Sequence, residues 1–248
     1  MYSFTNETNF LEKKREDKKI AMSIIKFILL KPRITNCIAR AMRPFYKPFR
    51  NRKNLQHINQ LISERFEKTS LNLENRLVVD LGANRGDFSR WALEQKAIVL
   101  AFEPDAVAFT HLVRRMKSFS NFFPVNAAVS NRTSIAKLFM HKNRNSDPLG
   151  HSISSSLLVT KTNIDPNQFK MVFCVDFEFI VNNFQIRLLK IDIEGAEGAI
   201  WEIIERYYKK IDYLVMEIHK TNNQDFISDV VNFISKNGLN DIWKIDWQ

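Results

Sequence analysis

Short apolar segments alternate with amphipathic segments over residues 76–247, and this alternation constrains the fold more than any other feature. Segments such as Arg76–Gly82 (RLVVDLG) and Arg187–Gly195 (RLLKIDIEG) have the length and apolar content of buried strands. The segments between them place apolar residues on one helical face, as in Ile200 and Ile204. Strands that are apolar on both faces belong in parallel sheets covered by helices. We therefore predict an α/β fold with a doubly wound, mostly parallel sheet of the seven-stranded type.

The individual elements follow from the same periodicities. Strands are predicted at 76–82, 97–104, 121–130, 187–195, 213–220 and 241–247, with a peripheral one at 135–142. Helices are predicted at 55–66, 87–95, 106–119, 196–208 and 224–238. Residues 141–170 are rich in Ser, Asn, Asp and Pro, so a loop that acts as a lid or is disordered is expected there.

The net charge of +10 is concentrated in one part of the chain. Residues 1–55 contain 14 Lys/Arg and 4 Asp/Glu, whereas the remaining residues contain 23 of each sign. We therefore divide the chain into a basic, helical N-terminal extension, 1–55, and a neutral domain, 56–248. The two cysteines, far apart and without metal-ligand spacing, argue against a disulfide scaffold or a zinc site and favour the reducing cytoplasm.

The basic extension contains an acid-free stretch, residues 18–53. Its apolar run is too short to span a bilayer, but Ile20, Ile24 and Phe27 fall on one face of a helix. Three roles are open: packing on its own domain or on a partner subunit, peripheral contact with an anionic membrane at its inner face, and, less favoured, binding to nucleic acid.

Acidic residues stand where four predicted strands end. They are Asp80, Glu103, the pair Asp192 and Glu194, and Glu217, which is followed two positions later by His219. The carboxyl ends of parallel strands meet at one rim of a doubly wound sheet, which is where such sheets bind ligands. One such acid is commonly a helix cap, but several converging acids are costly unless a cation or hydrogen-bond donors meet them.

The first strand leads into a glycine turn, Gly82-Ala83-Asn84-Arg85-Gly86. The turn lacks both the G-x-G-x-x-G spacing of dinucleotide-binding proteins and the Lys-Ser/Thr of a P-loop. Asn84 tolerates a positive φ, so the turn can still be tight. Glu103, at the end of the next strand, is placed to accept both hydroxyls of a ribose. Together these features predict a nucleotide-containing cofactor.

The segment LLKIDIEGAEGAIW carries three carboxylates within six residues, Asp192, Glu194 and Glu197. Such a group persists only if a cation, a set of donors or raised pKa values relieve its repulsion. Helix capping and an ion pair with Lys190 account for one or two of the three acids, but not easily for all of them.

The motifs VVDLGANRGDFS, AFEPD, NAAVSN, LLKIDIEGAE and VMEIH, in this order, resemble the FkbM family of S-adenosylmethionine-dependent methyltransferases. The resemblance covers about Leu73 to Lys220, and KIDIEGAE is its most specific element. It implies a Rossmann-like fold that binds S-adenosylmethionine, and O-methylation of a hydroxyl on a sugar, glycan or natural product.

The same resemblance implies roles for individual residues. Lining the methionine end of the cofactor are Asp80, Gly82, Ala83, Asn84 and Gly86. Glu103 holds the ribose, Asn126 and Ala127 border the adenine, and Asp192 lies near the sulfonium. Facing the acceptor are Glu194, Glu197, Glu217 and His219. Methyltransferases of this class usually end in an antiparallel pair of strands, whereas 241–247 is the last predicted strand here, so the seventh strand is not assigned.

An aliphatic hydroxyl needs a base during methyl transfer, and His219 is our first choice, followed by Glu217 and Asp192. A divalent metal on the acids is the less favoured alternative, and no metal ligands are assigned. Competing hypotheses are an RNA methyltransferase tethered by the basic extension, a cofactor-binding module without catalysis, and a dehydrogenase. The acids at the strand ends favour methyl transfer over the last two.

Overall fold

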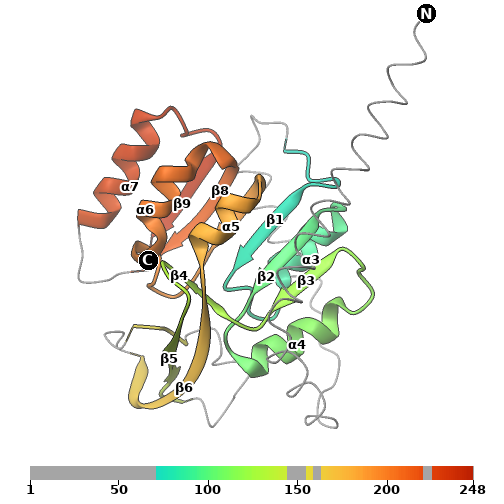
Figure 1. The fold of residues 1–248 in the computed structure, drawn as a ribbon, viewed down its shortest axis with the longest axis vertical. Coiled ribbons are helices and arrows are strands. Elements are labelled where there is room, and N and C mark those ends of the chain that lie inside the picture. Colours follow the sequence, from blue (N-terminus) through green and yellow to red (C-terminus); the bar gives the residue numbers. More distant parts are fainter. Residues whose placement is uncertain (1–70, 144–154, 159–162, 220–224, 248) are drawn as a thin grey trace, which may run out of the picture. The chain divides into compact units, whose positions relative to one another are not determined.

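The computed structural model describes residues 71–143, 155–158, 163–219 and 225–247. The predicted basic extension and the predicted helix at 55–66 lie outside these residues. The described residues form a six-stranded sheet, a three-stranded sheet, five α-helices and one short 3₁₀ helix (Figure 1).

The six-stranded sheet has the order β3-β2-β1-β7-β8-β9, and every pair of neighbours is parallel. Its strands are β1 (Leu77–Leu81), β2 (Ile98–Phe102), β3 (Phe122–Val125), β7 (Ile186–Ile191), β8 (Ile211–Ile218) and β9 (Trp243–Trp247). All residues of β1 and β2 are buried, which explains their apolar composition on both faces. The predicted doubly wound, Rossmann-like α/β fold is confirmed.

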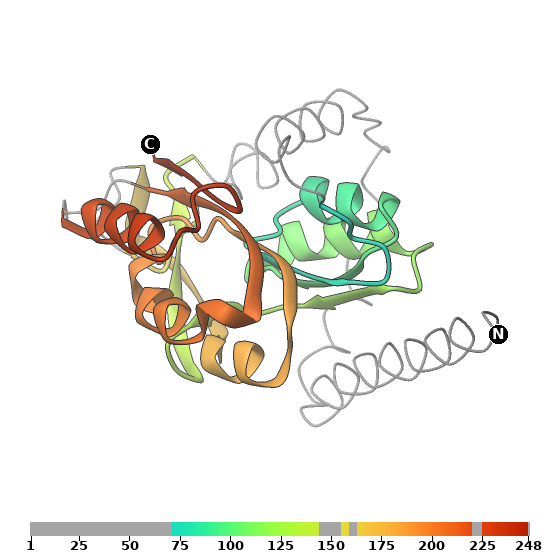
Figure 2. The same cartoon turned by 90° about the horizontal axis from the view of Figure 1, so that it is seen from above.

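The helices connect these strands. They are α3 (Asp87–Glu94), α4 (Ala106–Met116), α5 (Phe177–Asn183), α6 (Gly198–Tyr207) with the 3₁₀ helix η2 (Tyr208–Lys210), and α7 (Asp225–Lys236). The strand order runs outward from β1 to β3 in one direction and from β7 to β9 in the other. Because crossover connections between parallel strands are right-handed, the helices that connect β1 to β3 lie on one face of the sheet and those that connect β7 to β9 lie on the opposite face. Figure 2 shows α3 and α4 on one side of the sheet, and α5 and α6 on the other.

Strands β1 and β7 are neighbours in the sheet, and the direction of winding reverses between them. In doubly wound proteins a crevice opens at the carboxyl ends of the two strands that flank this switch point. The loops after β1 and β7 are the glycine turn and the IDIEGAE segment. The topology therefore brings together the two segments with the strongest sequence signals.

The structure corrects two predictions of secondary structure. The predicted strand at 121–130 is two strands in different sheets, β3 and β4 (Ala128–Ser130). The predicted loop at 141–170 contains the first half of a long strand, β6 (Ile164–Asp176), which pairs antiparallel with β5 (Ser134–His141) and parallel with β4. The polar composition of this region reflects the exposure of β6, whose residues 166–171 are mostly solvent-exposed.

The edge of the main sheet agrees with the sequence, which assigned no seventh strand. Strand β9 pairs directly with β8 in parallel, and no antiparallel strand joins this sheet among the described residues. The predicted seven-stranded type is thus represented by six described strands. None of the described helices has the length and apolar character needed to cross a lipid bilayer.

Candidate active site

The glycine turn after β1 is tight because three of its residues adopt left-handed backbone conformations. Gly82 has φ 75°, Asn84 has φ 48° and Gly86 has φ 84°. Asn84 therefore takes the conformation that the sequence predicted for it. The amides of Gly82 and Ala83 both donate to the carbonyl of Phe102, at 3.0 and 2.9 Å, which ties the turn to the end of β2.

The two glycines of this turn have different functions. A Cβ on Gly82 would overlap the backbone carbonyl of Asp192, so the glycine allows the β1 and β7 loops to approach each other. A Cβ on Gly86 would collide with the side chain of Leu112 and lie 3.1 Å from Met116 Cε. Gly86 therefore serves the packing of α3 on α4, and it is not among the residues that line the pocket.

Glu103 follows β2 and is only 5% exposed. Its Oε2 accepts a hydrogen bond from the amide of Asn84 at 2.8 Å, and its Oε1 accepts one from the amide of Asp105 at 2.7 Å. Burial raises the pKa of Glu103 to about 8, whereas the two N–H donors favour the carboxylate, since each oxygen accepts one of them. Each oxygen retains a further lone pair for a ligand hydroxyl.

The predicted adenine-side residues, Asn126 and Ala127, take different positions. The Asn126 amide donates to the carbonyls of Glu103, at 2.8 Å, and Pro104, at 3.3 Å, so it shapes the loop after β2. Ala127 is buried and lines the pocket.

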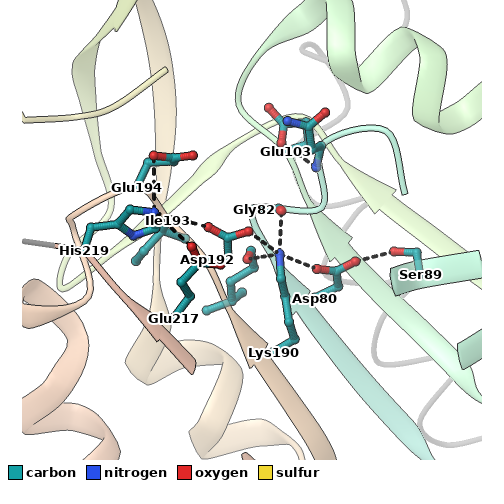
Figure 3. A network of polar contacts seen from close by, with 12 residues as sticks. Asp80, Gly82, Ser89, Glu103, Lys190, Asp192, Ile193, Glu194, Glu217 and His219 are labelled. Atoms are coloured by element: carbon teal, nitrogen blue, oxygen red, sulfur yellow. Dashed lines mark hydrogen bonds and ion pairs between the residues drawn. The ribbon is translucent and has the colours of Figure 1, made fainter. Parts of the chain in front are cut away.

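Asp80, the last acid of β1, is fully buried. Its Oδ2 accepts a hydrogen bond from the Ser89 hydroxyl at 2.6 Å, and its Oδ1 lies 3.4 Å from Lys190 Nζ (Figure 3). Lys190 Nζ also lies 3.3 Å from Asp192 Oδ2 and donates to the carbonyl of Gly82 at 2.7 Å. Burial alone would lower the pKa of Lys190, but the charges of Asp192 and Asp80 outweigh it and raise that pKa. Lys190 thus joins the loops after β1 and β7.

The turn after β7 directs its acids to different places. Glu194 has φ 57° and Gly195 has φ 101°, so the chain turns sharply between them. The Ser156 hydroxyl donates to the Glu194 carbonyl at 2.6 Å. Ser156 itself pairs with Phe139 of β5. Glu197 is 1% exposed and turned inward, and its Oε1 accepts hydrogen bonds from the amides of Gly195, at 3.0 Å, and Ile193, at 3.3 Å.

His219 stands directly after β8 and is largely buried among acids. Its Nδ1 lies 3.1 Å from Glu197 Oε1, and its Nε2 lies 3.5 Å from both Glu194 Oε2 and Glu217 Oε1. Nε2 is also 4.0 Å from Asp192 Oδ1 (Figure 3). Burial and the nearby charge of Asp192 raise the pKa of Glu217, and the charges of His219 and Lys190 oppose this rise.

A pocket of about 350 Å³ opens at this rim. Of the predicted site residues, it is lined by Gly82, Ala83, Asn84, Glu103, Ala127, Asp192, Glu194 and Glu217. The predicted residues Asp80, Gly86, Asn126, Glu197 and His219 do not line it and instead support those that do. A pocket of this size, in which charged groups converge beside an apolar surface, is typical of a small-molecule site.

Several lining residues were not predicted from the sequence. They are Arg85, Asp87, Phe88, Phe102, Pro104, Ala128, Val129, Leu138, Ser155, Leu157, Lys190, Ile193 and Val215. Lys190 had a signal, because a lysine inside a buried strand next to acids is unusual. Leu138, Ser155 and Leu157 had none, because the three-stranded sheet brings them to the pocket from far along the sequence.

The fold and the site define a doubly wound α/β domain with an acid-lined pocket at the switch point of its sheet. The family described as the methyltransferase FkbM domain matches residues 80–239, which is well over half of the chain. The protein belongs to this family, as its motifs predicted.

Two solved structures are similar to this chain. One is methyltransferase FkbM from Methylobacillus flagellatus KT, with 17% identity, a TM-score of 0.40, and coverage of 64% of this chain and 37% of that one. This chain thus spans little more than a third of that structure. The other is the putative RNA methyltransferase PH1948 from Pyrococcus horikoshii, with 14% identity, a TM-score of 0.37, and coverage of 81% and 79%. Comparison with curated proteins gives no match.

Proposed function

We propose that the protein transfers a methyl group from S-adenosylmethionine to a hydroxyl oxygen of a small molecule, most simply a sugar or another polyol. The observation that carries this proposal is that Asp192, Glu194 and Glu217 line the same pocket as the glycine turn and Glu103. Carboxylates only accept hydrogen bonds, so this rim suits a ligand rich in hydroxyl donors and a cofactor with positive charge.

The residues of the pocket fit the cofactor. Glu103 offers two carboxylate oxygens to ribose hydroxyls, and Ala127 leaves room for a flat base beside it. Arg85 and the amides at the start of α3 suit the carboxylate of the methionine moiety, and Asp192 suits its positive charges. When bound, the cofactor supplies an electrophilic methyl group.

The chain's own task is to orient the acceptor and to take its proton. As the new carbon–oxygen bond forms, the acceptor O–H bond breaks and the proton needs a base within hydrogen-bond reach. Glu217 lines the pocket, and its raised pKa makes it a better proton acceptor than an ordinary carboxylate, so we assign the proton to it. His219, the base predicted from the sequence, lies behind the lining acids, so an acceptor reaches it only if Glu217 or Glu194 moves aside.

The proposal is tested first at the level of the cofactor. Calorimetry with the full chain should show binding of S-adenosylmethionine and none of NAD. Glu103→Ala should weaken that binding at least tenfold, because charged hydrogen bonds of this kind contribute about 1.5–3 kcal/mol. The matched control is Glu74→Ala, because Glu74 is an exposed acid that pairs with Lys96.

Methyl transfer is tested with isotopically labelled S-adenosylmethionine, a panel of sugars and polyols, and fractionated cell extract, with products identified by mass spectrometry. A labelled methyl ether supports the proposal. Labelling confined to RNA, or cofactor binding that Glu103→Ala leaves unchanged, would refute it.

A further inference from the structure

The imidazole of His219 is held between one acid on one side and three on the other. Glu197 Oε1 lies 3.1 Å from Nδ1, and Glu197 is buried and accepts two backbone N–H groups at the same oxygen. Because this oxygen serves as an acceptor in both of those contacts, we assign the hydrogen of the His219 contact to Nδ1. The Nε2 edge of the ring is therefore the edge that faces Asp192, Glu194 and Glu217 (Figure 3).

This arrangement has the form of a metal ligand with its supporting carboxylate. Metal-bound histidines donate their second ring N–H to a carboxylate or a carbonyl, which fixes the tautomer and aims the other nitrogen at the ion. Glu197 provides that support. Asp192, Glu194 and His219 each offer a ligand atom, and these atoms all lie within 4.8 Å of one another.

The charges of the described residues also favour a bound cation. Five carboxylates gather here: Asp80, Asp192, Glu194, Glu197 and Glu217. The Lys190 ammonium forms its ion pairs with two of them, Asp80 and Asp192. A cation bound among these carboxylates would relieve their mutual repulsion.

We propose that Asp192 Oδ1, Glu194 Oε2 and His219 Nε2 bind one divalent cation. Ligands about 2.1 Å from an ion are separated by roughly 3.0–3.4 Å in octahedral or tetrahedral geometry. The distances from Nε2 to the two carboxylate oxygens are 3.5 Å for Glu194 and 4.0 Å for Asp192, so binding requires side-chain shifts of up to about 1 Å. One imidazole and two carboxylates suit Mn²⁺ or a similar ion better than Ca²⁺.

The role of the cation in catalysis rests on the proposed function, although its binding does not. A cation at this point borders the pocket, since Asp192 and Glu194 line it. It would bind the acceptor oxygen and stabilise the negative charge that develops there as Glu217 takes the proton. His219 is then a ligand, and Glu217 is the base.

The test uses the full-length protein freed of metal by a chelator and titrated with Mn²⁺ alone, without S-adenosylmethionine. Electron paramagnetic resonance should show one bound Mn²⁺ per chain, and electron spin echo modulation should show coupling to a histidine ¹⁴N nucleus. His219→Ala should abolish the ¹⁴N coupling. Glu194→Gln should weaken Mn²⁺ binding at least tenfold, whereas Glu202→Gln, on the exposed face of α6, should leave it unchanged.

The outcomes separate this proposal from the proposed function. If Mn²⁺ does not bind while S-adenosylmethionine does, the acids serve the cofactor's own charge and the cation site is refuted. Retention of the ¹⁴N coupling in a folded His219→Ala variant also refutes it. If Mn²⁺ binds with the expected coupling but S-adenosylmethionine does not, the cation site is supported and the proposed function fails.

Discussion

The carbonyl oxygen of Asp192 occupies the place in which a side chain on Gly82 would begin. The two residues are separated by more than one hundred positions in the sequence, but they follow neighbouring strands, β1 and β7. Lys190 joins the same loops, because its ammonium donates to the Gly82 carbonyl and pairs with Asp192. Gly82, Lys190 and Asp192 all line the pocket, so this close approach shapes its wall.

Gly82→Ala should destabilise the protein by about 2–4 kcal/mol, because the new Cβ meets backbone and the residue has φ 75°. Gly238→Ala is the matched control, since Gly238 has φ 68° but no atom within 4 Å of an added Cβ. Thermal unfolding of both variants separates backbone strain from the overlap with Asp192. Equal losses would show that the close approach contributes nothing.

Lys190→Met should destabilise the protein by about 3–5 kcal/mol, because it leaves the buried Asp80 without its positive partner. The double variant Lys190→Met, Asp80→Asn should recover much of that loss, since the uncompensated charge is then removed. Urea unfolding of the two single variants and the double variant measures the coupling. Additive losses would mean that the ion pair is unimportant for stability.

Ser156→Ala removes the hydroxyl that donates to the Glu194 carbonyl. We expect a loss of stability of about 1 kcal/mol and a fall in kcat of up to roughly tenfold, because the sharp turn that aims the Glu194 side chain is less well fixed. The measurements are thermal unfolding and steady-state kinetics with the acceptor found by mass spectrometry. Ser235→Ala, at an exposed position of α7, is the control. An unchanged kcat would show that Ser156 has a structural role only.

The affinity for S-adenosylmethionine should rise with pH as Glu103 ionises, because the carboxylate accepts ribose hydrogen bonds better than the protonated acid does. Burial raises the pKa of Glu103 to about 8, and the nearby Asp105 also raises it, while the amides of Asp105 and Asn84 and the charge of Lys190 lower it. The affinity for S-adenosylmethionine should therefore increase as the pH rises towards 8 and level off at higher pH.

Glu103→Gln supplies the control for this pH dependence, because it keeps the shape of the side chain but does not titrate. Calorimetry between pH 6 and 9 should show a rise in affinity in the native protein that is absent from the variant, once the cofactor's own titration, common to both, is subtracted. The same slope in both proteins would assign the effect to the cofactor.

The sequence by itself determined the main sheet and the parts of the site that belong to it. Buried parallel strands are apolar on both faces, so β1, β2, β7 and β8 were recognisable from local composition. The carboxyl ends of such strands share one rim, and the structure places Asp80, Glu103, Asp192 and Glu217 at or next to the ends of their strands. The tight glycine turn was predictable for a local reason, the backbone freedom of Gly and Asn.

Only the tertiary structure decided which of these acids face the pocket. Glu197 and His219 do not line it, because their side chains bond to each other and Glu197 also accepts backbone amides. The first half of strand β6 was predicted as a loop because its polar residues are exposed, and its pairing with the distant β5 leaves no local pattern. A separate bridge between Ser156 and Phe139 of β5 accompanies the hydrogen bond from Ser156 to Glu194. Contacts between segments far apart in sequence depend on how the whole chain packs, so they cannot be predicted from local periodicity.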